Sequence, residues 1–204
     1  IPQSYLCKPS SPVFDLLKRG GKQQQEHLEK ILRLRISQAR SPAVPAMSSP
    51  TPSKLAERSQ LYSPVKAPGP MVRSLSLELI YRKVLELMVS RTRKLVQDLK
   101  MVNMLEQIVV ALIHEVTSQF ELLEGRHLDQ MMICTVYGVA RVMKIDVITF
   151  RRILQHYRTQ SHTTSAVWKR VPLPKGGSSD IIEFYNTVFI GNMESYLLRF
   201  QTNP

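Results

Sequence analysis

The sequence predicts an all-α domain, and three observations carry that prediction. Apolar residues recur at spacings of three, four and seven from residue 75 to residue 200, which is the period of an amphipathic helix. The segment 128–144 is apolar on nearly every side, as expected of a helix surrounded by other helices. No stretch shows the convincing alternation of apolar and polar residues that indicates a β-strand. We therefore expect five helices with one of them central.

The order of the elements follows from the same periodicity and from local stop and start signals. The five expected helices cover residues 75–99, 102–123, 128–144, 150–157 and 180–200. Gly125 is a natural stop before the central helix, and Asp146 and Thr149 are both competent N-caps for the fourth. Residues 175–179, with sequence KGGSS, are expected to form a loop before the last helix.

The first 73 residues have a different composition. Ser11 and Pro12 suit the start of a short helix with an apolar patch, and residues 23–40 could form a helix that is marginal by itself. Residues 41–73 hold seven of the 13 prolines and few large apolar groups, so we expect a disordered linker. The start of the chain indicates an internal fragment of a longer protein. We divide the chain into segments 1–22, 23–73 and 74–204.

Charge and cysteine content exclude several classes of protein. The net charge is +12, but residues 1–73 carry +8 of it and residues 74–204 only +4, with the charges of the folded part interspersed. This distribution argues against a folded nucleic-acid-binding domain. Cys7 and Cys134 are too few and too far apart for a disulfide framework, which favours a reducing, intracellular compartment. No run of 18 apolar residues predicts a transmembrane helix.

We find no convincing catalytic or metal-binding pattern. His127 and Cys134 are seven residues apart, and no second pair completes a zinc site. Lys175-Gly176-Gly177-Ser178 lacks the residue order of a phosphate-binding loop. No segment resembles a nucleophile elbow. We expect no enzyme activity, no cofactor and no metal.

Ser/Thr-Pro pairs gather in the proline-rich segment. Four occur within 33 residues, and Thr51 and Ser63 are each followed by Pro and then, two residues later, by Lys. This pattern suits a proline-directed, cyclin-dependent kinase, although Ser-Pro pairs are common in any linker of this composition. The phosphorylation candidates are Ser63, Thr51 and Ser11.

Two polar features interrupt apolar helices. Tyr185-Asn186 lies within the apolar run 181–190, at a position expected to be at least partly buried. The Asn186 amide either bonds to neighbouring backbone or lies on the floor of a groove, where it would bond to the main chain of an extended peptide. Likewise, Tyr137 with Arg141 one turn on is either a half-buried Tyr beside a solvated Arg or one wall of the same groove.

Several of these blocks resemble the second cyclin-like repeat, the B box, of the retinoblastoma-family pocket proteins. The blocks with the closest resemblance are RHLDQ at 126–130, MICTVYG at 132–138 and IEFYNTVF at 182–189. The resemblance implies a five-helix cyclin-like fold over 74–204, a disordered phosphorylatable spacer over 23–73, and the end of the family's A box over 1–22. It also implies that this domain packs on a complete A box and exposes apolar surface without one.

The resemblance implies binding and regulation in the nucleus: a transcriptional co-repressor, tumour suppressor and cell-cycle regulator. Its groove would take LxCxE peptides of viral oncoproteins and of histone deacetylase and other chromatin-modifier complexes. The implied groove residues are Tyr137, Arg141, Arg151, Tyr185, Asn186 and Leu198. With the A box, a cleft that includes Lys83 and Arg91 would bind the transactivation segment of E-two-F/DP transcription factors. Cyclin-dependent kinases would regulate that cleft, with phosphorylated Ser63 as an intramolecular competitor.

Two residues depart from the family's pattern. Glu194 stands where the family usually places a Lys at the groove, and Glu86 stands where a basic residue is expected near the cleft. Both would repel acidic partners. Two other classes remain open: a cyclin-like kinase activator or general-transcription protein, and a basic nucleic-acid-binding protein. The second class predicts salt-sensitive duplex binding that survives removal of residues 1–73.

Overall fold

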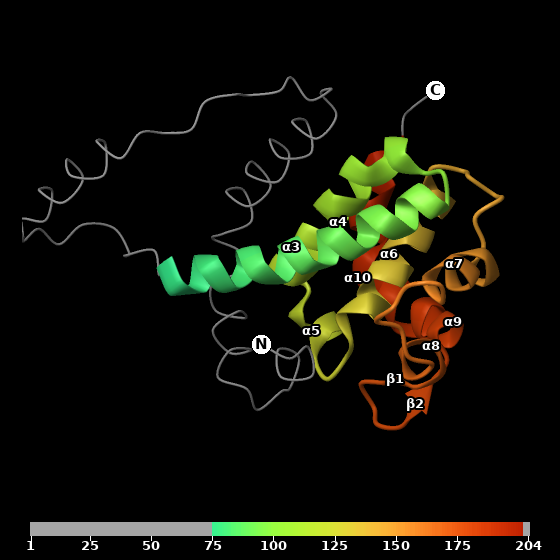
Figure 1. Cartoon of the computed structure of the whole chain (residues 1–204). Coiled ribbons are helices and arrows are strands. Elements are labelled where there is room, and N and C mark those ends of the chain that lie inside the picture. The colour runs from blue at the N-terminus through green and yellow to red at the C-terminus, as the bar shows by residue number, and fades with distance from the viewer. Residues whose placement is uncertain (1–74, 202–204) are drawn as a thin grey trace, which may run out of the picture.

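The structure, a computed structural model, describes residues 75–201. The predicted segments 1–22 and 23–73 lie outside the described residues, so the division of the chain at these boundaries stays a prediction. The main helices are α3 (Leu75–Asp98), α4 (Leu105–Ser118), α6 (Leu128–Val142), α7 (Phe150–Tyr157) and α10 (Ile190–Leu197). The prediction of an all-α fold is confirmed (Figure 1).

The central position predicted for the helix after Gly125 is also confirmed. Twelve of the fifteen residues of α6 are buried, on every side of the helix. Helices α3, α4, α7 and α10 all pack against it (Figure 1). Because no broad face of α6 meets water, its side chains join the other helices into one core.

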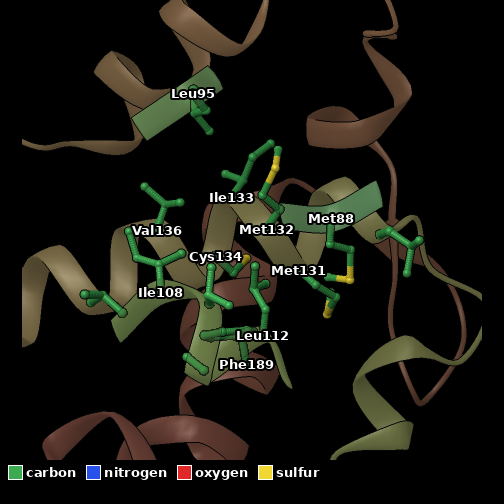
Figure 2. Close-up of a cluster of buried hydrophobic side chains, with 14 of the residues drawn as sticks. Met88, Leu95, Ile108, Leu112, Met131, Met132, Ile133, Cys134, Val136 and Phe189 are labelled. Atoms are coloured by element: carbon green, nitrogen blue, oxygen red, sulfur yellow. The ribbon is translucent and has the colours of Figure 1, made fainter. Parts of the chain in front are cut away.

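The core is a single cluster of apolar side chains from α3, α4, α6 and the last helix. Figure 2 shows Met88, Leu95, Ile108, Leu112, Met131, Met132, Ile133, Cys134, Val136 and Phe189, each no more than 1% exposed. Burial of a side chain of this size stabilises the fold by about 1.5–3 kcal/mol relative to its exposure. Helices far apart in sequence therefore hold one another in place.

The expected helix at 102–123 is interrupted, so that prediction was wrong in detail. It consists of the 3-10 turn η3 (Val102–Met104), α4, and the short α5 (Phe120–Leu123). Gln119 has φ −118° and ψ 54°, outside the helical region, and this residue separates α4 from α5. The apolar periodicity continues across the break, which is why the pattern alone does not reveal it.

A small hairpin contradicts the expectation that the domain has no strands. β1 (Val171–Pro172) pairs antiparallel with β2 (Ser178–Ser179), after the short helix α8 (Ala166–Lys169). Gly176 and Gly177 have φ of 89° and 80°, a region that favours glycine, so the predicted loop forms the turn of this hairpin. Strands of two residues are too short to produce an alternating pattern.

The predicted last helix runs almost unbroken to Phe200, but its hydrogen-bond pattern changes on the way. It begins with α9 (Ile181–Phe184), passes through the π-helical turn η4 (Tyr185–Phe189) into α10, and ends in the 3-10 turn η5 (Leu198–Phe200). Asp180 caps its start, because one carboxylate oxygen accepts hydrogen bonds from the backbone N–H groups of Ile182 and Glu183, each at 2.9 Å.

Candidate functional site

The start of α6 is fixed by a reciprocal capping arrangement. His127 is the N-cap, and its Nδ1 accepts a hydrogen bond from the backbone N–H of Asp129 at 3.2 Å. Gln130 closes the arrangement, because its Oε1 accepts from the backbone N–H of His127 at 2.9 Å. Its Nε2 also donates to the carbonyl of Val167 at 3.1 Å, which ties α6 to α8.

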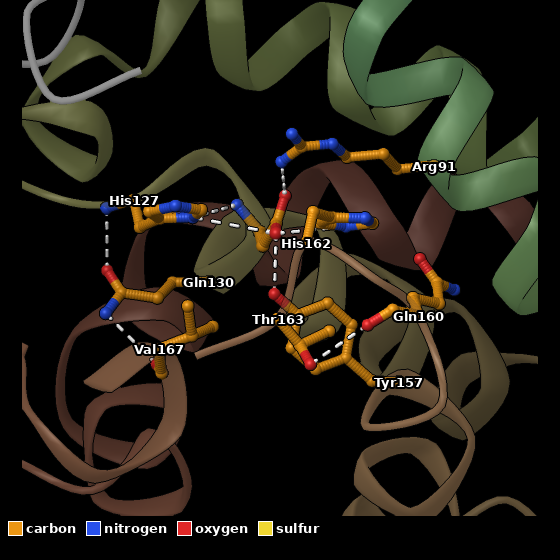
Figure 3. A network of polar contacts seen from close by, with 9 residues as sticks. Arg91, His127, Gln130, Tyr157, Gln160, His162, Thr163 and Val167 are labelled. Atoms are coloured by element: carbon orange, nitrogen blue, oxygen red, sulfur yellow. Dashed lines mark hydrogen bonds and ion pairs between the residues drawn. The ribbon is translucent and has the colours of Figure 1, made fainter. Parts of the chain in front are cut away.

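The buried carboxylate of Asp129 joins three helices (Figure 3). Arg91 of α3 donates from Nη1 to Oδ1 at 2.8 Å, and Tyr157 of α7 donates its hydroxyl to Oδ2 at 2.5 Å. His162 Nε2 and His127 Nδ1 lie 3.4 and 3.7 Å from Oδ2. Burial lowers the pKa of both histidines despite the nearby carboxylate. This network positions α6 and α7 relative to α3.

An aromatic cluster lies where α6, α7 and η4 meet. The Tyr137 ring is 4.0 Å from the Phe150 ring and 5.0 Å from the Tyr185 ring, centroid to centroid. Phe150 and Tyr185 are 5.3 Å apart in an edge-to-face arrangement, and Phe189 stacks behind Tyr185 at 5.5 Å. Tyr137 is half-buried, so the cluster reaches the surface at this ring.

Gly138 allows the last helix to approach α6 closely. A Cβ at this position would lie 2.8 Å from Leu197 Cδ1 and 3.6 Å from the Tyr185 hydroxyl oxygen. Tyr185 is 7% exposed, and burial raises the pKa of its hydroxyl to about 12. The phenol therefore stays neutral and retains a proton to donate at physiological pH.

The π turn coincides with the residues Tyr185 to Phe189, and π turns are frequent at functional sites. Tyr185 and Phe189 are buried, whereas Asn186 is exposed, so the expectation that Asn186 is partly buried was wrong. Among the described residues, the Asn186 side chain forms no hydrogen bond. Its amide is therefore available to both a donor and an acceptor of a ligand.

A row of four side chains extends from Asn186 along the outer face of the last helix. Its members recur every four residues, the spacing of neighbours on one helix face: Asn186, Ile190, Glu194 and Leu198. We call this set the outer row. Leu198 is 43% exposed, a high value for a large apolar side chain at the end of a core helix. The outer row and the rings of Tyr137, Phe150 and Tyr185 together form what we call the aromatic site.

Comparison with known proteins identifies the family. The sequence profile of the family described as Retinoblastoma-associated protein B domain matches residues 76–178. The chain belongs to this family. The match begins at the second residue of α3 and ends at the first residue of β2, so it stops before the outer row.

Plant proteins named as retinoblastoma-related are similar to this B domain. The protein of Cocos nucifera is 30% identical over 133 residues, covering 60% of this chain and 13% of the relative. The protein of Pilosella officinarum is 29% identical over 134 residues, again 60% and 13%. Retinoblastoma-related protein 1 of Oryza sativa subsp. japonica is 28% identical over 174 residues, 78% of this chain and 17% of the relative. The chain therefore spans about a sixth or less of the length of these relatives.

The structure brings most of the predicted groove residues of the B domain together. Tyr137, Tyr185, Asn186 and Leu198 all belong to the aromatic site. Arg141 lies one turn after Tyr137, and it faces Tyr185 closely enough to lower the pKa of that hydroxyl, against the larger effect of burial. Arg151 is exposed and follows Phe150 directly at the start of α7.

Sequence reasoning missed Phe150 as a site residue. The apolar spacing of α7 predicts that Phe150 lies on the buried face of the helix, and its 6% exposure confirms this. Its contacts with Tyr137 and Tyr185 could not be predicted, because they depend on how α6, α7 and the last helix pack together. Its position between the N-cap Thr149 and Arg151 is the one sequence signal that it lies at a helix end, where side chains can line a site.

The residues predicted for a transcription-factor cleft lie on α3, apart from the aromatic site. Lys83 is exposed, and its Nζ lies 3.7 Å from a carboxylate oxygen of Glu86. Arg91 is 19% exposed and is bound to Asp129, so it has a structural role whatever else it contacts. The predicted phosphorylation residues Ser63, Thr51 and Ser11 lie outside the described residues.

Residues 75–201 contain neither a grouped set of metal ligands nor a membrane-spanning helix. Within that range, no three His, Cys, Asp or Glu side chains are grouped as ligands of a metal ion. Across the same residues no helix combines the length and apolarity needed to cross a bilayer. Cys134 is fully buried, and burial raises the pKa of its thiol well above the usual range, which makes it a core residue of low reactivity.

Proposed function

We propose that this chain is the B-domain part of a pocket-type transcriptional co-repressor and cell-cycle regulator that acts in the nucleus by binding other proteins. The single observation that carries the proposal is the exposed Asn186 amide beside the Tyr137–Phe150–Tyr185 cluster, which reaches the surface at the half-buried Tyr137. A carboxamide offers one acceptor and two donors, which matches the N–H and C=O groups of an extended peptide. Aromatic rings next to it supply an apolar wall for the peptide's side chains.

The peptide class that we propose for this site has the LxCxE pattern. Leu and Cys side chains are small and apolar enough to lie against the rings and against Leu198, while Asn186 bonds the main chain between them. Arg141 and Arg151 are exposed cations for the acidic residue. Exposed charges of this kind act mainly on association rate and salt dependence. Viral oncoproteins, histone deacetylase and other chromatin-modifier complexes are the proposed sources of such peptides.

A second proposed contact involves α3 and a complete A box. There, the acidic transactivation segment of E-two-F/DP factors would meet Lys83, with Arg91 holding α3 in place through Asp129. The carboxylate of Glu86 near Lys83 reduces the local positive charge. Cyclin-dependent kinases acting on Ser63 and Thr51 would add an internal anionic competitor. These steps rest on the family resemblance and on the exposure of Lys83.

The test is a titration of a labelled LxCxE peptide against this chain co-expressed with an A box. We expect low-micromolar or tighter binding and a loss of about five- to 150-fold in Asn186→Ala, because two main-chain hydrogen bonds of about 0.5–1.5 kcal/mol each disappear. Asn103→Ala is the matched control, because Asn103 is an exposed amide on η3, which contributes nothing to the aromatic site. Failure of a folded complex to bind the peptide would refute the proposal.

A further inference from the structure

Glu194 is an exposed acid in the middle of the outer row. It lies two turns after Asn186 and one turn before Leu198, so a segment that contacts both passes its carboxylate. No basic side chain forms an ion pair with Glu194 among the described residues. Its negative charge is therefore not compensated by the domain.

Arg141 and Glu194 both act electrostatically on one side chain, the hydroxyl of Tyr185. The close approach at Gly138 holds the Tyr185 hydroxyl against α6, three residues before Arg141. That hydroxyl is influenced by both charges, in opposite directions: Arg141 lowers its pKa and Glu194 raises it. Both charges therefore lie near the same part of the aromatic site, the Tyr185 hydroxyl.

The cation of this pair is partly neutralised. Arg141 Nη1 lies 3.4 Å from a carboxylate oxygen of Asp146. Asp146 therefore offsets part of the attraction that Arg141 would exert on an acidic ligand. At the end formed by α7, Arg151 and Arg152 have no carboxylate partner within the part of the chain that the structure describes. Glu194 on α10 therefore presents an unpaired negative charge, and Arg151 and Arg152 at the start of α7 present unpaired positive charges.

We propose that this site selects peptides of mixed charge, with a basic residue where the peptide passes Glu194 and an acidic residue where it passes Arg151. This inference rests on the proposed peptide function and specifies its ligand. A peptide that is acidic on both flanks meets repulsion at Glu194, and a peptide that is basic there gains an attraction. The occupant is a single extended protein segment, because the outer row and the rings present one continuous strip rather than a broad face.

The test uses four peptides with one LxCxE core, in which the N-terminal or the C-terminal flank carries either two Lys or two Glu. They are titrated at low salt against the A-box complex of the parent chain, Glu194→Gln and Glu194→Lys. At one of the two flanks, we expect the Lys form to bind the parent about three- to fivefold more tightly than the Glu form, the usual scale for an exposed pair. The preference should vanish in Glu194→Gln and reverse in Glu194→Lys.

Ser195→Lys is the control, because Ser195 is exposed on the same helix but about 100° away from the outer row. Ser195→Lys adds a positive charge to the helix but not to the outer row, so the preference for Lys over Glu in the peptide flank should persist. Raising the salt to about 1 M should weaken the preference, since the Debye length falls to about 3 Å.

The outcomes separate the two proposals. Binding of all four peptides with equal affinity to the parent, or a Lys preference that persists in Glu194→Gln, overturns the charge selection and leaves the peptide site standing. Absence of binding by every peptide to a folded complex overturns the peptide function itself. Because Glu194 is exposed, Glu194→Gln should unfold at the parent's temperature, which verifies that affinity changes are local.

Discussion

Glu115 is a fully buried acid in the core of the domain. One of its carboxylate oxygens accepts a hydrogen bond from the Thr135 hydroxyl, and the other has no partner among the described residues. Burial raises the pKa of Glu115 to about 8, although the hydrogen bond from Thr135 opposes the shift. The carboxyl is therefore largely protonated at neutral pH, and it becomes a buried charge only in alkaline solution.

Substitution Glu115→Gln should change how stability depends on pH. The pKa of Glu115 is about 8 in the folded protein and 4.5 in the unfolded chain. Its contribution to stability is complete below pH 4.5 and is lost as the pH rises from 4.5 to about 8. The parent should therefore lose stability between these limits, by up to about 1.4 kcal/mol per pH unit, whereas Glu115→Gln should not. Urea unfolding at pH 5, 7 and 8.5 measures the difference. A constant difference across these pH values would contradict the assignment.

Gly138 and Gly191 form a matched pair of helical glycines. At Gly138 a Cβ would approach Leu197 Cδ1 to 2.8 Å, whereas at Gly191 it would meet no atom within 4 Å. Gly191→Ala should stabilise the domain by about 0.5–1 kcal/mol through helix propensity alone. In Gly138→Ala the same gain in helix propensity is outweighed by overpacking against the buried Leu197, which costs about 1–3 kcal/mol. The net effect should be a destabilisation of about 1 kcal/mol. Thermal unfolding compares the two, and a stabilised Gly138→Ala would show that Leu197 repacks freely.

At the scale of elements, long periodic segments were predictable and their irregularities were not. Helices α3 and α6 follow from apolar spacing, and the end of α6 at Val142 falls within two residues of the expectation. The interruption at Gln119 and the π turn at Tyr185 leave the pattern of apolar residues almost unchanged. They depend on how the last helix and α4 fit against α6, which is a property of tertiary packing.

The candidate site shows the same division. Tyr137, Tyr185 and Asn186 stood out because polar groups interrupt apolar runs, and the structure brings them together. The exposure of Asn186 was not predicted, because the apolar residues of 181–190 form a nearly continuous run. In the structure Tyr185 is buried and Asn186, the next residue, is exposed. Phe150 belongs to the cluster because α7 packs against α6, and this packing is not visible in the sequence.

The hydrogen bonds of Asp129 should contribute measurably to the free energy of unfolding, because they join α3, α6 and α7. Asp129→Asn keeps the shape of the side chain but leaves the partly buried Arg91 without its counter-charge. We expect a loss of about 2–3 kcal/mol in the free energy of unfolding, the scale for hydrogen bonds to charged groups. Asp146→Asn is the control, because its pair with Arg141 is exposed and should contribute less than about 1 kcal/mol. Equal effects of the two substitutions in urea titrations would show that the network is not structural.

At the scale of the whole molecule, the charges of residues 74–204 are less interspersed than we expected from the sequence. Residues 74–204 carry a net +4, yet residues 141–175 contain eight Lys/Arg and one Asp, and the remainder of the domain is net negative. The positive segment includes α7, α8 and β1, and the start of α7 contributes Phe150 to the aromatic site. Local positive charge of this extent attracts acidic protein segments, but it also makes weak contact with nucleic acid possible.

Removal of residues 1–73 tests whether the folded domain, with its positive segment 141–175, binds nucleic acid by itself. Duplex DNA binding depends on the number of phosphates neutralised, with a slope of log K against log salt of about −0.9 per contact. Because residues 1–73 hold +8 of the net +12, we expect the deletion to weaken binding of a labelled duplex at least tenfold at low salt and to reduce the slope. Fluorescence anisotropy across a salt series measures both quantities, and a retained unfolding transition verifies that the remaining domain is folded. Tight, salt-sensitive binding by residues 74–204 alone would instead make the segment 141–175 a nucleic-acid surface, which Arg151→Glu with Arg152→Glu should then abolish.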